Sequence, residues 1–260
     1  MESKVRAGLF IGIVALLAIA LSVSLYMERR GEADSLTLRV GVDDGITGMM
    51  IADVALAAER NGLAIDLNLF ADCCGNAAQW AINSGELDVG FFCPGIADVL
   101  VSLNNDLEIY GPAVMNSEVM AFGAGIEAPA TVAVPFQRYF LNDLVYGNFP
   151  TVTEIVQAAP DSLPFALMSG RAEGAVLDTA QALLAPDFVF MPLSGEDYIS
   201  YCLVVRKGLT DSPQFKQFLE TYNLIADEYN DPEFISRRFG ISDNLREMVN
   251  VRFVYLQTGK

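Results

Sequence analysis

The chain of 260 residues contains no histidine, and this absence removes several kinds of active site at once. Neither a Ser-His-Asp triad nor a Cys-His pair can form without an imidazole to act as the general base. The sequence also lacks the phosphate-binding P-loop and the G-x-G-x-x-G pattern of dinucleotide-binding folds. These absences favour a binding protein without a cofactor over an enzyme.

Basic residues are also few, with 16 lysines and arginines against 33 aspartates and glutamates and a net charge of −17. The first 34 residues carry as many basic as acidic side chains, so all of the excess negative charge lies beyond them. A body this acidic repels the phosphates of a nucleic acid. We therefore expect no nucleic-acid partner.

Only one long apolar run is present, at Ala7–Tyr26, where twenty residues carry no charge. As a helix this run would span about 30 Å, the thickness of the hydrocarbon core of a bilayer. Basic residues flank it on both sides, so the charge distribution does not fix its orientation. We predict that residues 1–34 form an N-terminal membrane anchor, a transmembrane helix with a linker. A signal segment is the alternative, and the rest of the chain is expected outside the cytoplasm.

Apolar strands alternate with helical segments over most of the remaining chain. This order is typical of an α/β fold with parallel or mixed sheets and right-handed crossovers. The predicted strands lie at 36–42, 64–70, 87–92, 130–134, 151–158 and 172–177. The predicted helices include 49–62, 77–85, 96–105, 138–148 and 163–170, with Ser212-Pro213 and Asp231-Pro232 starting two more near the C-terminus.

An internal repeat underlies this pattern. Ala81–Cys93, "AINSGELDVGFFC", aligns without gaps on Ala166–Asp178, "ALMSGRAEGAVLD", at an offset of 85 residues. Each copy contains a helix end, a glycine turn, an acidic residue and a strand that delivers one residue, Cys93 or Asp178, to its carboxyl end. The gapless register predicts two lobes of similar construction.

Four segments in order resemble the type II periplasmic solute-binding proteins of ABC importers. They are "LRVGVDDGITGMMIADVALAAERNGLAIDLNLF", "AINSGELDVGFF", "SGRAEGAVLDTAQALL" and "DYISYCLVVRKGLTDSPQFKQFLETYNLIADEYNDPEFI". Within that family the chain is most similar to the branch that binds nitrate, taurine, alkanesulfonates or thiamine precursors. The cysteine-rich loops depart from this pattern, and so does the retained anchor.

The resemblance implies two α/β lobes, one formed by 36–115 plus 200–260 and the other by 118–195. A small organic solute would bind in the cleft between them and pass to an ABC permease, and the part outside the membrane would be monomeric. One alternative is an enzyme on the same fold that acts on a small aromatic or pyrimidine-like acid. A second alternative is a thiol-based binder of a soft metal or metalloid.

Ligands of open parallel sheets bind beyond the carboxyl ends of the strands, so the residues at those ends are the candidate contacts. Arg138 is suited to pairing with a carboxylate or sulfonate, and Tyr198 to stacking on a ring. Thr47 is either a contact or a helix cap. The candidate site residues are Asp44, Thr47, Cys73, Cys74, Gly75, Asn76, Cys93, Pro94, Asn116, Phe136, Gln137, Arg138, Asp178 and Tyr198.

The cysteines have three interpretations. Cys73, Cys74, Cys93 and Cys202 are all placed where they could line one cleft. They are small buried apolar residues, or Cys93 forms a disulfide with Cys73 or Cys74, or the thiols bind a soft metal. The spacing does not match a structural zinc site. Metal binding by Cys73, Cys74 and Cys93 is therefore the least favoured of the three interpretations. The single tryptophan, Trp80, is expected in the core.

Overall fold

A computed structural model of the protein describes residues 37–123, 125–184, 188–240 and 250–257. Within it, the described residues from Leu38 onward form one compact unit. The predicted membrane anchor at 1–34 lies outside the described residues. Among the helices that the structure does describe, none combines the length and the apolar character needed to cross a membrane.

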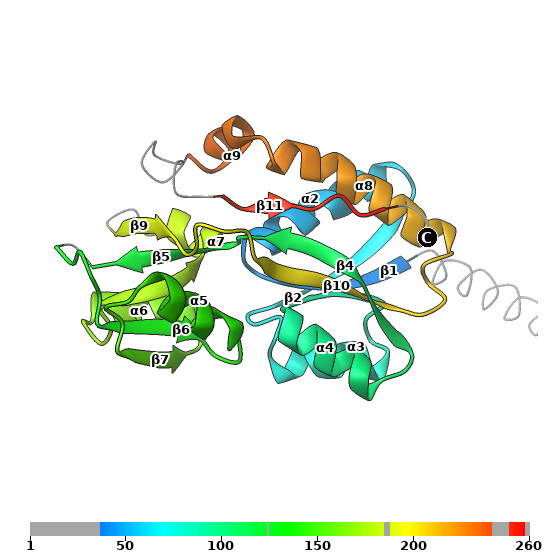
Figure 1. The fold of residues 1–260 in the computed structure, drawn as a ribbon. Coiled ribbons are helices and arrows are strands. Elements are labelled where there is room, and N and C mark those ends of the chain that lie inside the picture. The colour runs from blue at the N-terminus through cyan, green and yellow to red at the C-terminus, as the bar shows by residue number, and fades with distance from the viewer. Residues whose placement is uncertain (1–36, 124, 185–187, 241–249, 258–260) are drawn as a thin grey trace, which may run out of the picture. The chain divides into compact units, whose positions relative to one another are not determined.

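The first of two sheets has the strand order β11-β4-β10-β3-β1-β2. β1 is parallel to β3, whereas β10 is antiparallel to β3 and β4, so the sheet is mixed. Figure 1 shows helices on both faces, with α2 and α8 on one side and α3 and α4 on the other. The strands are β1 (Thr37–Asp43), β2 (Ala64–Phe70), β3 (Val89–Phe92), β4 (Leu107–Met115), β10 (Ile199–Arg206) and β11 (Arg252–Phe253), and the helices are α2 (Ile46–Arg60), α3 (Asn76–Ser84), α4 (Pro94–Leu103), α8 (Pro213–Tyr229) and α9 (Pro232–Phe239).

The second sheet has the order β7-β6-β8-β5-β9 and is also mixed. β6 runs parallel to β7 and β8, and β5 runs antiparallel to β8 and β9. Its strands are β5 (Glu118–Phe122), β6 (Thr131–Pro135), β7 (Glu154–Ala158), β8 (Gly174–Asp178) and β9 (Val189–Pro192), and its helices are α5 (Phe140–Asn148), α6 (Leu163–Met168) and α7 (Thr179–Leu183), with a 3-10 turn η1 at Pro160–Ser162.

The chain passes between the sheets twice, from β4 to β5 and from β9 to β10, and Asn116 ties the two passages together. Its backbone has a positive φ of 56°, a conformation that asparagine tolerates better than most residues. Its Oδ1 accepts the N–H of Tyr198 at 3.0 Å, and its Nδ2 donates to Asp197 at 2.7 Å. The predicted boundaries of the lobes, at 36–115 plus 200–260 and 118–195, stay a prediction.

The internal repeat has the same construction in both sheets. The carboxylate of Asp88 accepts the backbone N–H of Arg39 at 3.0 Å, and the carboxylate of Glu173 accepts that of Ala130 at 2.6 Å. In each copy the acid therefore fastens the turn before β3 or β8 to the neighbouring strand. Both copies end on the N-cap of a helix, which is Cys93 for α4 and Asp178 for α7.

Some sequence expectations about local structure are confirmed and others are wrong. Ser212 and Asp231 cap α8 and α9 as predicted. Thr47 is not a helix cap, because α2 begins at Ile46 after Gly45. Trp80 is 62% exposed and not in the core, because α3 buries the face that carries its alanines and isoleucine instead.

Candidate functional site

A cavity of about 190 Å³ lies at the carboxyl ends of strands from both sheets. The first sheet contributes the residues that follow β1 and β2, and the second contributes those that follow β6, β7 and β8. This is the location where open parallel sheets bind ligands, because the loops and helix N-termini beyond the strands supply polar groups. The lining residues are Asp43, Asp44, Gly45, Met49, Ala71, Pro135, Arg138, Pro160, Asp161, Asp178, Ala180, Gln181 and Leu184.

Arg138 is the central cation of this site, and only 4% of it is exposed. Its Nη1 lies 3.2 Å from Oε1 of Glu118, and its Nη2 lies 3.6 Å from Oδ2 of Asp43. The guanidinium also stands 5.2 Å from the centre of the Tyr201 ring. Burial alone would lower the pKa of Arg138, but the surrounding acidic groups outweigh burial and raise it. Arg138 is therefore charged and already paired.

Glu118 begins β5 and is fully buried behind Arg138. Its Oε2 accepts the hydroxyl of Ser200 at 2.7 Å and that of Tyr198 at 3.2 Å. Burial raises the pKa of Glu118, and the charge of Arg138 opposes this rise. The predicted stacking residue Tyr198 thus holds a carboxylate with its hydroxyl.

Asp43 ends β1 and has two differently placed carboxylate oxygens. Oδ2 faces Arg138 and accepts a hydrogen bond from the hydroxyl of Tyr201. Oδ1 is buried and has no hydrogen-bond partner among the described residues. Burial raises the pKa of Asp43, while Arg138 and Tyr201 act in the opposite direction.

Asp178 ends β8 and connects the two sheets. Its Oδ1 accepts the N–H of Ala180, at the start of α7, at 2.8 Å and the N–H of Ile46, at the start of α2, at 2.9 Å. Gly45 permits this approach, because a Cβ at that position would lie 2.7 Å from the carboxyl carbon. Oδ2 is buried without a partner in the described structure. Burial and the charge of Asp43 raise the pKa of Asp178 to about 8.

The structure brings three of the predicted contacts, Asp44, Arg138 and Asp178, into the lining of the cavity. Asn116 and Tyr198 lie at the passages between the sheets, and Gln137 turns the chain before Arg138 with a φ of 66°. The remaining polar and apolar candidates are not part of the lining. Thr47 is buried, Phe136 and Asn76 are exposed, and Gly75 and Pro94 are partly exposed at the starts of α3 and α4.

Cys73, Cys74 and Cys93 are gathered in one core cluster, but Cys202 is not. Cys202 packs against the other face of the first sheet, because side chains alternate along β10. The expectation that all four cysteines line one cleft is therefore wrong. All four thiols are free, so the disulfide of Cys93, one of the three interpretations of the cysteines, is absent from this structure.

The two adjacent cysteines differ in their electrostatics. Burial raises the pKa of Cys73 well above its usual value. Burial also opposes ionisation of Cys74, but hydrogen bonds from Cys73 and Cys93 and the charge of Arg138 lower its pKa well below the usual value. Cys74 Sγ accepts the backbone N–H of Cys93 at 3.2 Å, which accounts for part of this effect.

Sequence reasoning missed Glu118, Asp161 and Ser200. For Glu118 a signal was available, because an acid at the start of the apolar strand "EVMAF" has to be paired if that strand is buried. Asp161 and Ser200 carried no such signal, since both residue types are common in loops and strand ends.

Comparisons with known proteins extend the description of the fold. No protein family and no curated protein sequence matches this chain. Solved structures do match it. The ligand-binding component of an ABC-type import system from Staphylococcus aureus, with zinc bound, has a TM-score of 0.64 and 14% identity, covering 85% of this chain and 86% of that one.

Two further structures have the same fold. A nutrient-binding protein from Burkholderia cenocepacia bound to methionine has a TM-score of 0.55 and 21% identity, covering 78% of this chain and 97% of that one. The methionine-binding protein MetQ has a TM-score of 0.59 and 17% identity, covering 85% and 99%. The chain therefore has the two-lobed α/β fold of ABC-import substrate-binding proteins, with a cavity between its sheets that is lined by both charged and apolar residues.

Proposed function

We propose that the protein is an extracytoplasmic solute-binding protein that captures a small organic solute carrying a protonated amine and delivers it to an ABC permease. Its fold is shared with proteins whose described ligands include methionine, a compound with such an amine. The cavity supports the proposal because its walls come from both sheets. A solute held there would contact both sheets at once, which is how closure is coupled to binding in two-lobed proteins.

The sign of the charge on the solute follows from the charged groups around the cavity. Four aspartates line it, at positions 43, 44, 161 and 178, but only one cation does. That cation, Arg138, is already paired with two carboxylates. A buried carboxylate is unfavourable unless it is paired or hydrogen-bonded, so a positively charged solute stabilises this arrangement and an anion destabilises it.

The observation that carries the proposal is a pair of buried acceptors in the cavity wall. Asp43 Oδ1 and Asp178 Oδ2 are both buried, and neither has a partner in the described structure. An ammonium group has three N–H donors and no acceptor, and it therefore complements two carboxylate oxygens. Arg138 Nε is also buried without a partner. A carboxylate or hydroxyl elsewhere on the solute would accept its hydrogen bond.

The size of the cavity limits the solute to a small molecule. A cavity of about 150 Å³ accommodates a benzene molecule, so 190 Å³ accommodates roughly eight non-hydrogen atoms. Small amino acids and amino alcohols fall in this range.

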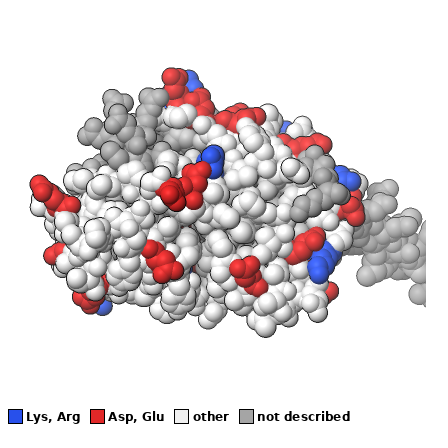
Figure 2. All heavy atoms as spheres, viewed as in Figure 1, with Lys and Arg blue, Asp and Glu red and all other residues white. Residues whose placement is uncertain are grey.

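The negative charge of the molecule also favours a cation as solute. Acidic side chains are spread over the face visible in Figure 2, with fewer basic ones among them. The resulting field attracts cations toward the protein and repels anions. The narrower resemblance to the nitrate and alkanesulfonate branch stays a prediction, and the charge of the cavity argues against a ligand that is only an anion.

The test compares matched solutes that differ by one group. Isothermal titration calorimetry of the full chain in detergent would measure an amino acid, its deaminated analogue and its decarboxylated analogue, beginning with methionine. We expect the deaminated acid to bind at least about tenfold more weakly than both amines, since the lost contact is a hydrogen bond between charged groups. Equal binding of the deaminated acid, or tighter binding of nitrate and ethanesulfonate, would overturn the proposal.

Two variants and one control locate the effect in the cavity. Asp43→Asn and Asp178→Asn each remove one carboxyl group that can pair with an ammonium, and both should weaken binding of the amines. Asp106→Asn removes an exposed carboxylate far from the lining residues and should leave the affinity unchanged. Conversion of the bound solute to a product during these measurements would favour the alternative of an enzyme.

A further inference from the structure

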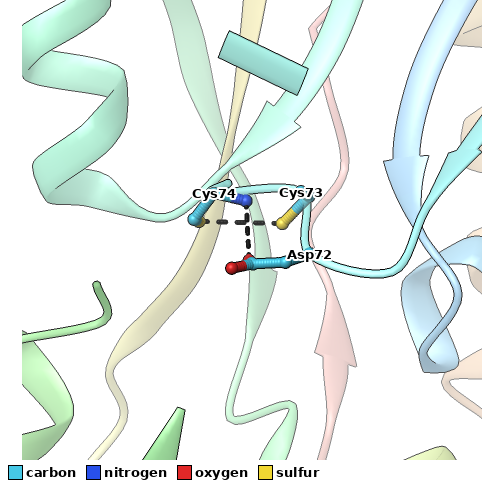
Figure 3. Close-up of side chains that lie close together, drawn as sticks. All are labelled: Asp72, Cys73 and Cys74. Atoms are coloured by element: carbon cyan, nitrogen blue, oxygen red, sulfur yellow. Dashed lines mark hydrogen bonds between the residues drawn. The ribbon is translucent and has the colours of Figure 1, made fainter. Parts of the chain in front are cut away.

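We infer that Asp72, Cys73 and Cys74 form a binding site for one thiophilic divalent cation of the zinc class, behind the wall of the solute cavity. The three residues belong to the loop between β2 and α3, and their ligand atoms all lie within 4.8 Å of one another. Figure 3 shows the two sulfur atoms on either side of the Asp72 carboxylate. None of the three residues lines the cavity, but Cys73 Sγ lies 4.0 Å from Oδ2 of Asp43, which does. The inference rests on the metal ligands alone and not on the identity of the solute.

The separation of the two sulfur atoms fits tetrahedral coordination of a single ion. Cys73 Sγ and Cys74 Sγ are 3.7 Å apart. Two zinc–sulfur bonds of about 2.3 Å that meet at the tetrahedral angle place their sulfur atoms about 3.8 Å apart. An ion therefore fits between the thiols without a change in their separation. Adjacent cysteines in an extended chain would point to opposite sides, so the loop brings the two side chains together.

Asp72 is suited to be the third ligand. One of its carboxylate oxygens accepts the N–H of Cys74 at 3.0 Å, which holds the side chain beside the thiols. Two thiolates and a carboxylate form a donor set that zinc accepts, with the fourth position taken by water or by another group. The chain has no histidine, so cysteine and carboxylate are the side chains from which a zinc site in this protein is built.

Further contacts hold the sulfur atoms in place. Cys74 Sγ accepts the backbone N–H of Cys93 at 3.2 Å. Hydrogen bonds of this kind to a ligating sulfur orient it and stabilise its negative charge. Cys73 Sγ lies 3.9 Å from Nη2 of Arg138, a residue of the second sheet.

Binding of the ion is balanced in charge. Each thiol that is protonated releases its proton to solvent as its sulfur–zinc bond forms. Two positive charges enter the site as up to two protons leave it, and the ion requires no oxidant or reductant. The buried surroundings therefore do not have to accept a large new charge.

Cobalt and zinc titrations test this site. The full chain would be purified in detergent, kept reduced with a phosphine and freed of metal, then titrated with Co²⁺ and afterwards with Zn²⁺. We expect one Co²⁺ per chain with a sulfur-to-cobalt charge-transfer absorption that one equivalent of Zn²⁺ abolishes. Cys73→Ser and Cys74→Ser should each reduce this absorption per bound cobalt and bind at least tenfold more weakly, and Asp72→Asn should also bind more weakly.

Cys202→Ser is the matched control, because Cys202 is a buried free thiol in a different core cluster. It should bind the metal as the unmodified chain does. Alkylation of the unmodified chain gives a second measurement that does not depend on the folding of a variant. Zn²⁺ should slow the alkylation of Cys73 and Cys74 and leave the alkylation rate of Cys202 unchanged. Metal binding that survives both serine variants, or an absence of binding and protection, would overturn the inference.

Discussion

Asp178 should make solute binding depend on pH. In the solute-free protein burial and the charge of Asp43 raise its pKa to about 8, so the carboxyl is mostly protonated at neutral pH. A bound ammonium favours the ionised form and lowers this pKa. Binding below pH 8 therefore has to release the proton first, and the affinity should increase as the pH rises through the solute-free pKa.

The size of the effect follows from this pKa. A carboxyl with a pKa of about 8 weakens the binding of a cation about 30-fold at pH 6.5 and only about 1.3-fold at pH 8.5, so Kd should decrease about 25-fold over this interval. At pH 7 the complex should form with release of about 0.9 proton. The Asp178→Asn variant should show less than about a threefold change in Kd across the same interval.

Isothermal titration calorimetry measures both quantities. Kd would be determined for the tightest-binding amine at several pH values between 6.5 and 8.5, where the amine itself stays protonated. Titration in buffers with different ionisation enthalpies at pH 7 gives the number of protons released. Asp106→Asn should retain the dependence of the unmodified chain. An affinity that is flat, or that increases toward low pH, would refute the assignment of Asp178 as the residue that contacts the amine.

Two further substitutions test the framework of the site. Arg138→Met should lower the free energy of unfolding by about 3–5 kcal/mol in urea denaturation, because it leaves Asp43 and Glu118 buried without a countercharge. A loss as small as that of the exposed control Lys207→Met would contradict the pairing of these carboxylates by Arg138. Asn116→Ala should cost about 2 kcal/mol by the same measurement, from three lost side-chain hydrogen bonds and a positive φ that alanine disfavours. The exposed control Asn105→Ala should change the stability little, and an equal effect of the two would show that the ties between the passages are unimportant.

The sequence predicts much of the fold because its local signals agree with the tertiary structure. Local sequence preferences and tertiary packing favour the same structure in several places. Examples are the alternation of strands and helices, the glycine turns and the helix start at Ser212-Pro213. The repeat was informative for a similar reason. Each copy fulfils the same local requirement, an acid that fastens a turn to a strand, so the residues that matter recur at a fixed offset.

The site was predicted less completely, because its charges pair over long distances in the chain. Glu118 meets Arg138 across 20 residues, and Asp178 meets Ile46 across 132 residues. No local pattern encodes such pairs. The predictions for Cys202 and Trp80 were wrong for a different reason. The surroundings of each side chain depend on which face of its strand or helix is covered, and packing between distant elements decides this.

The contact between Asp178 and the start of α2 has a consequence for selectivity. The N-terminus of a helix attracts anions, and this one already holds a carboxylate that is tethered to the same molecule. Because this group is tethered, it competes with dissolved anions for the helix N-terminus at an effective concentration of about millimolar or more. This concentration does not depend on the composition of the medium. An anion from solution would therefore have to displace the carboxyl group of Asp178 from this helix end before it could bind there.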